Sequence, residues 1–211
     1  MTRSDDSQAL IAAAAEWRLI GLLLERPRRG WHAEVARLGR EMANPELRRL
    51  VTAARRATEG DYLGRLGPGG VVSPREVTYQ PFADPGHLLA DLAACYDAFA
   101  FRPHVEEPID HLAVEVAFVG YLLLKEAFAG ARGDHCAATT TARARRAFID
   151  AHLAAFAAGF THRLEVLGAS NLLATARCLS ARLPARPAPE PRRSDENAMD
   201  VCGACGGPEA W

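Results

Sequence analysis

The sequence predicts an all-α protein built as a multi-helix bundle. Apolar residues recur every three or four positions in segment after segment, which is the spacing of a buried helix face. No stretch keeps the alternation of apolar and polar residues that a half-buried strand requires. Segment 112–124 is apolar on almost every side, and such a helix belongs in the middle of a bundle. With 211 residues, 49% of them hydrophobic, the chain can build one such domain.

Helix boundaries follow from proline, glycine and capping residues. Pro27 closes the first helix, and Asn44 followed by Pro45 predicts an N-cap with proline at the first helical position. Gly168 ends a long helix that Gly159 is expected to bend. The predicted helices cover residues 7–25, 31–42, 46–58, 87–101, 110–129, 140–167 and 170–183.

Three connections separate these helices. Residues 60–86 are too rich in glycine and proline for a regular helix, so we predict a long extended loop before the central helices. A loop of that length inside a compact domain points to a functional role. Residues 102–109 are predicted to form an acidic hinge, and residues 130–139 a turn.

The most informative stretch runs from Glu107 to Phe128. An acidic, proline-containing loop ends in Asp110 and His111 and leads directly into the apolar central helix. A carboxylate at the start of a helix accepts a backbone N–H and is stabilised by the helix dipole, so Asp110 is expected to be the N-cap. A capping role leaves open a second role in binding.

Four motifs follow one another within residues 69–160. They read Ser-Pro-Arg-Glu-Val-Thr-Tyr at 73–79, Tyr-x2-Phe at 96–99, Pro-x-Asp-His-Leu at 108–112 and Phe-x3-His-Leu-x2-Phe-x3-Phe at 148–160. Together they resemble the TorD/DmsD/NarJ-type chaperones, a family of helical proteins that mature molybdenum-containing oxidoreductases and bind twin-arginine leader peptides. The chain departs from that family's motifs at Arg75, at Ala98 and at Phe156, where an aromatic residue, a glycine and a tryptophan are respectively common.

The resemblance implies a non-catalytic chaperone in the cytoplasm that needs no cofactor of its own. The expected partner is the apo catalytic subunit of a molybdenum oxidoreductase, or its twin-arginine leader peptide, bound during cofactor insertion and before export. Binding a leader requires an apolar groove and carboxylates for the arginine pair, because a guanidinium pairs with a carboxylate through two hydrogen bonds. The candidate client-binding residues are Tyr79, Phe82, Tyr96, Phe99, Glu107, Pro108, Asp110, His111 and Glu115.

Two other functions fit parts of the sequence. One is an assembly partner that binds a folded redox-enzyme subunit without reading any leader. The other is a helical metalloenzyme, because His111 and Glu115 lie four residues apart and both can face a metal. A third ligand is missing from that motif, so Glu115 is more simply expected to pair with an arginine or a backbone group. His111 is expected to titrate near neutral pH.

Charge and hydropathy set the remaining expectations. A formal net charge of −1 gives no reason to expect a nucleic-acid partner. The charge-free run 116–124 is far shorter than the roughly 18–20 residues that span a membrane, so no membrane insertion is predicted. The apolar run 10–15 lies between Asp6 and Glu16, which does not fit an export signal. Exchange of helices across the hinge would give a homodimer.

The last residues differ from the rest of the chain. We predict a helical chaperone domain over 1–183 and a disordered tail over 184–211, which begins rich in proline and arginine and ends with Cys202-x2-Cys205. The cysteine pair is open to three interpretations: a tail without specific chemistry, contact with a metal or cluster, or a redox dithiol. Cys95, Cys136 and Cys178 are expected to be small apolar residues of the helices and turns.

Overall fold

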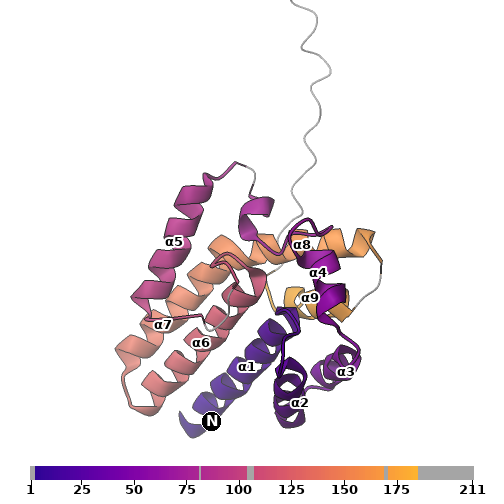
Figure 1. Ribbon diagram of the computed structural model, residues 1–211. Coiled ribbons are helices and arrows are strands. Elements are labelled where there is room, and N and C mark those ends of the chain that lie inside the picture. Colours follow the sequence, from indigo (N-terminus) through magenta and orange to yellow (C-terminus); the bar gives the residue numbers. More distant parts are fainter. Residues whose placement is uncertain (1–2, 81, 104–106, 169–170, 185–211) are drawn as a thin grey trace, which may run out of the picture.

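The computed structural model describes residues 3–80, 82–103, 107–168 and 171–184, and within these ranges the chain is all-α, as predicted (Figure 1). The only strand-like pairing in the described ranges is one isolated bridge between Arg75 and His111. The elements in order are α1 (Arg3–Leu24), α2 (Trp31–Glu41), α3 (Pro45–Ala54), α4 (Glu59–Leu66), a 3-10 helix η1 (Glu76–Tyr79), α5 (Pro85–Ala98), α6 (Leu112–Ala131), α7 (His135–Phe148), a π-helical turn η2 (Ile149–Leu153), α8 (Ala154–Val166) and α9 (Asn171–Ser180).

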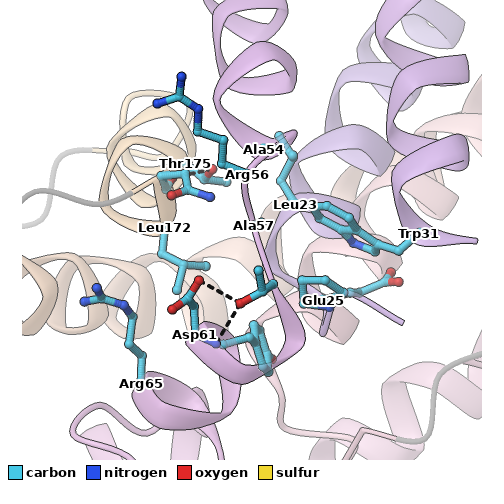
Figure 2. Close-up of a pocket in the computed structure, with 14 residues that line it drawn as sticks. Leu23, Glu25, Trp31, Ala54, Arg56, Ala57, Asp61, Arg65, Leu172 and Thr175 are labelled. Atoms are coloured by element: carbon cyan, nitrogen blue, oxygen red, sulfur yellow. Dashed lines mark hydrogen bonds between the residues drawn. The ribbon is translucent and has the colours of Figure 1, made fainter. Parts of the chain in front are cut away.

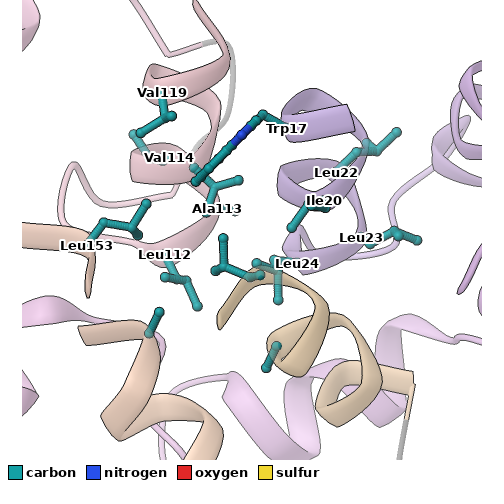
Figure 3. Packing of buried hydrophobic residues seen from close by; sticks show 14 of the residues in the cluster. Trp17, Ile20, Leu22, Leu23, Leu24, Leu112, Ala113, Val114, Val119 and Leu153 are labelled. Carbon is teal, nitrogen blue, oxygen red and sulfur yellow. The ribbon is translucent and has the colours of Figure 1, made fainter. Parts of the chain in front are cut away.

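Helix α6 is the central element, as the sequence predicted. Its longest contact is with α1, which runs antiparallel beside it (Figure 1), and α7 packs on another side. Glycines bring the two backbones of α1 and α6 together, because a Cβ on Gly21 would lie 3.3 Å from the carbonyl oxygen of Ala113. Buried side chains such as Trp17 and Val114 fill the space between and around the pair (Figure 3).

Helix α1 is long and apolar enough over Asp6–Leu24 to cross a membrane, judged by length and composition alone. In the structure 44% of that window is buried, and the helix packs along α6. The same helix contacts α2, α3 and α9 on its other sides. This is the environment of a core helix in a bundle.

The predicted loop over residues 60–86 is partly wrong. Residues Glu59–Leu66 form α4, which begins at Thr58, where the side-chain hydroxyl accepts a hydrogen bond from the backbone N–H of Asp61. The helix forms despite its two glycines because Tyr62 and Leu66 are buried in the core, and tertiary packing outweighs a weak local preference. The remainder of the loop holds the short η1 helix, which carries part of the first motif.

Two further boundaries differ from the prediction, while the Asn44 cap and Pro45 at the start of α3 are confirmed. Helix α7 begins at His135, inside the expected turn, because the carboxylate of Asp134 caps it by accepting from the N–H of Ala137. The predicted long helix is interrupted by the five-residue π-helical turn η2, and Gly159 lies within α8, which follows that turn.

The tail from residue 185, with Cys202 and Cys205, lies outside the described residues, so the proposed domain division stays a prediction. The other three cysteines all lie on helices: Cys178 is buried in the core, Cys95 is half-buried and Cys136 is exposed. Cys136 lies in the first turn of α7, whose N-terminal turn faces solvent.

Candidate functional site

The first and third motifs meet at the start of α6. The segment 73–79, which we call the strap, lies against residues 108–112. Two backbone hydrogen bonds join them: the N–H of Glu76 donates to the carbonyl of Asp110 (2.9 Å), and the N–H of Leu112 donates to the carbonyl of Pro74 (2.9 Å). Segments 35 residues apart therefore form one structural unit at the N-terminus of the central helix.

Asp110 is fully buried and does not cap α6, contrary to the prediction. The cap is His111, one residue later, because the helix begins at Leu112. The Oδ1 atom of Asp110 instead accepts a hydrogen bond from Nε of Arg75 at 2.6 Å, and Oδ2 has no partner among the described residues. The carboxylate therefore fastens the strap to the helix.

His111 is 2% exposed, and both ring nitrogens are engaged. Nδ1 accepts from the backbone N–H of Ala113 (3.1 Å), so the proton of the neutral ring sits on Nε2, which donates to the hydroxyl of Tyr62 (3.0 Å). That hydroxyl then donates to the carbonyl of Leu24 (3.3 Å). Burial lowers the pKa of His111 to about 4, so the expected titration near neutral pH is wrong.

The fourth motif reaches the strap through His152. Its Nδ1 lies 3.2 Å from Oε2 of Glu76, a fully buried carboxylate whose other oxygen accepts from the side chain of Gln80. The His152 ring packs on Phe148, with 5.0 Å between ring centroids. The strap is thus held from two sides, by α6 and by the π-helical turn.

Glu115 is fully buried on α6, and in the part of the chain that the structure describes neither carboxylate oxygen has a hydrogen-bond partner, which contradicts the predicted arginine or backbone partner. Burial raises the pKa of Glu115 well above its ordinary value, and the carboxylates of Glu76 and Asp110 add to this shift. Burial therefore favours the neutral acid over the carboxylate. Within the described ranges no group of three or more histidine, cysteine, aspartate or glutamate side chains is placed to hold a metal ion.

The aromatic candidates separate into core and surface residues. Tyr96 is buried, packs against Phe118, and donates its hydroxyl hydrogen to the carbonyl of Ile109 (2.9 Å), which anchors the end of the hinge. Phe99 is half-buried beside the same Phe118 ring, with centroids 6.2 Å apart. Phe82, by contrast, is 81% exposed on the surface. Tyr96 and Phe99 therefore serve packing, and Phe82 is the accessible one.

Tyr79 connects the strap to α8. Its ring lies 5.1 Å from that of Phe156 and closes over Gly159, where a Cβ would come within 2.6 Å of the ring. Its hydroxyl donates to the carbonyl of Ser73 (2.8 Å), and the guanidinium of Arg163 lies 4.8 Å above the ring centroid. Gly159 thus provides space for Tyr79, which is a role that the sequence did not indicate.

A cleft of about 500 Å³ opens beside the strap. Three of the predicted residues line it, namely Glu107, Pro108 and His111; the other lining residues are Arg26, Arg28, Tyr62, Leu63, Leu66, Gly67, Pro68, Gly69, Gly70, Ser73, Pro74 and Arg75. Glu107 is paired with Nη2 of Arg28 at 3.0 Å. The sequence did not indicate Arg26 and Arg28 as site residues, because an arginine-rich turn after a helix is typical of a solvated surface.

A second, smaller pocket of about 180 Å³ lies between α2, α4 and α9 (Figure 2). Arg56 and Arg65 lie on the side of Leu172, and Trp31 lies opposite. None of the client-binding candidates lines this pocket. The cleft beside the strap is therefore the candidate site.

The chain is an all-α bundle in which the strap and the start of α6 border a cleft, an arrangement suited to binding a partner. The sequence profile of the nitrate reductase delta subunit family matches residues 36–162, and the chain belongs to that family. These proteins are redox-enzyme maturation chaperones and not catalysts. The match contains all four motifs, and so confirms the resemblance at the level of the chaperone family. No curated protein matches the chain.

Proposed function

We propose that this protein is a cytoplasmic chaperone that binds the apo catalytic subunit of a molybdenum oxidoreductase while its cofactor is inserted. Membership of the nitrate reductase delta subunit family supports the assembly role. The observation that carries the proposal further is the convergence of motifs on one cleft: the strap, the loop at Glu107 and the start of α6 all line it. A cleft with few, well-placed polar groups and an apolar wall is suited to a peptide segment of a client.

The client segment enters between the strap and α4 in this proposal. Leu63 is partly exposed and offers apolar surface to such a segment. A twin-arginine leader would bind only by displacing internal partners, since Arg28 already holds Glu107 and Arg75 already holds Asp110. This internal pairing favours the second candidate, an assembly partner that binds the catalytic subunit without reading a leader.

Capture from the native host tests the proposal. A tagged copy of the chain should retain a molybdoenzyme catalytic subunit, and the retained subunit should bind more weakly when Leu63, which is 37% exposed and lines the cleft, is replaced by glutamine. A matched control is Leu167→Gln, which changes a similarly exposed leucine outside the cleft. Titration with the isolated N-terminal peptide of the captured subunit separates the two candidates, because only a leader-reading chaperone binds it.

Self-association is a separate proposal. If helices exchange across the hinge at 102–109, dimers form slowly and persist on dilution, since the central helix must leave its core. Size-exclusion chromatography after prolonged dilution distinguishes such a dimer from rapid surface association. A chain that elutes as a monomer at all concentrations would exclude the exchange.

A further inference from the structure

Arginines make up most of the charged residues that line the cleft beside the strap. Among the described residues that line it, the charged ones are Arg26, Arg28, Arg75 and Glu107. Glu107 is paired with Arg28, and Arg26 approaches Glu59 (3.6 Å), which does not line the cleft. A guanidinium brought into this space would find the carboxylates of Glu107, Asp110 and Glu59 already paired with arginines of the chain.

Arg75 lines this cleft beside the buried Asp110. Its Nε is used by Asp110 at 2.6 Å, whereas neither Nη has an acceptor among the described residues. The side chain is 39% exposed, and Asp110 behind it is fully buried. Because the five N–H donors of a guanidinium are fixed in one plane, holding Nε orients the two Nη groups as a pre-organised site for an acceptor.

The rest of the wall is apolar and narrow. Leu63 and Leu66 of α4 face the cleft, followed by the turn at residues 67–70. That turn is tight, since a Cβ on Gly67 would lie 2.6 Å from the carbonyl oxygen of Leu63. The space of about 500 Å³ therefore suits a few side chains of a peptide, apolar ones beside the leucines and one acceptor beside the arginine.

We propose that this cleft selects a client segment that presents a carboxylate to the Nη edge of Arg75 beside apolar residues, and that it disfavours an arginine pair at that point. The inference rests on the proposed function, because it names the chemistry of the client segment that the chaperone reads.

Three synthetic peptides test the inference. They share one frame of leucine and alanine residues and differ only in a central pair, which is Glu-Glu, Gln-Gln or Arg-Arg. Fluorescence anisotropy at low salt should give the tightest binding for Glu-Glu and the weakest for Arg-Arg, with about a fivefold or larger difference in Kd between these two. The difference should shrink as salt is added, because partly exposed charges are screened.

The decisive variant is Arg75→Gln. The amide nitrogen of glutamine stands the same number of bonds from Cα as Nε of arginine, so the donor to Asp110 is retained while both Nη groups are removed. The variant should melt close to the wild type and lose most of its preference for Glu-Glu over Gln-Gln. The control Arg37→Gln removes one positive charge from α2, outside the cleft, and should keep the preference.

Each result of these binding experiments either supports or overturns the inference. Equal or tighter binding of Arg-Arg to the wild type overturns the inference, and so does an unchanged preference in folded Arg75→Gln. If no peptide binds, the cleft is not a peptide site, and the inference fails. Capture of the intact apo catalytic subunit by the same preparation would then leave the chaperone function standing, whereas failure of both experiments removes the proposed function as well.

Discussion

Nε of Arg75 lies 2.6 Å from Oδ1 of Asp110, a carboxylate with no exposed surface. The pair joins the strap to the first residues of the central helix and is reinforced by the backbone bonds on either side of it. Removing one member of such a pair leaves the other buried and uncompensated, which costs far more than the pair contributes. The pair therefore gives a direct test of how the strap is held.

Arg75→Met should destabilise the protein by about 2–4 kcal/mol, because it leaves the Asp110 carboxylate buried without a donor. Adding Asp110→Asn should recover part of this loss, since a neutral amide is less costly to bury than a charge. Urea unfolding of both variants and the single Asp110→Asn variant completes the cycle. Strictly additive losses would show that the two side chains do not interact.

His111 should make stability depend on pH. Burial lowers its folded-state pKa to about 4, from an ordinary value near 6.5, so the unfolded chain binds a proton more readily. This contribution is complete above pH 6.5 and is lost as pH falls toward 4, amounting to about 2 kcal/mol between pH 6.5 and 5.

His111→Asn keeps an acceptor for the N–H of Ala113 and cannot be protonated in this range. The free energy of unfolding of this variant should therefore change less between pH 7 and pH 5 than that of the wild type. Identical pH profiles, measured by urea titration, would show that His111 is not the group responsible.

Glu115→Met should stabilise the protein. Both carboxylate oxygens lack partners, and an apolar side chain of similar volume removes the cost of burying them, on the order of 1–3 kcal/mol. Because the folded-state pKa is raised, the wild type loses stability as pH rises above the ordinary glutamate value, so the gain should be larger at pH 8 than at pH 5. A loss of stability at pH 8 would mean that Glu115 has an internal partner.

Gly159→Ala should loosen the strap. The added methyl would lie 2.6 Å from the Tyr79 ring, so either the ring or α8 must move, at a cost of about 1–3 kcal/mol. Gly64→Ala is the matched control: it also lies within a helix, has nothing within 4 Å of the new methyl, and should be neutral or slightly stabilising. Equal melting temperatures for the two variants would refute the packing role of Gly159.

Periodicity and composition predicted most of the fold. The apolar circumference of 112–124 identified the central helix, and Asn44 with Pro45 located the start of α3, because both signals are local. The sequence did not predict α4, because its two glycines favour a loop. The helix forms in the structure because Tyr62 and Leu66 are buried. Such tertiary effects have no signature in a single sequence.

The candidate site was predicted in part. The motifs indicated Glu107, Pro108 and His111, which do line the cleft. The partners of the acidic residues were not predictable, because Arg28 and Arg75 reach Glu107 and Asp110 only after the chain has folded. We expected carboxylates that are open to a client's arginines. In the structure the carboxylates of Glu107 and Asp110 are paired with internal arginines instead.

The proposed chaperone function is tested most directly by the molybdenum content of the catalytic subunit that the chaperone retains. The tagged chain should be purified from the native host, and the molybdenum content of the bound catalytic subunit should be measured against the same subunit isolated as mature enzyme. We expect a bound catalytic subunit that is depleted of molybdenum and is released when cofactor is supplied. A retained subunit with its full molybdenum content, or a purification that retains no molybdoenzyme subunit at all, would contradict it.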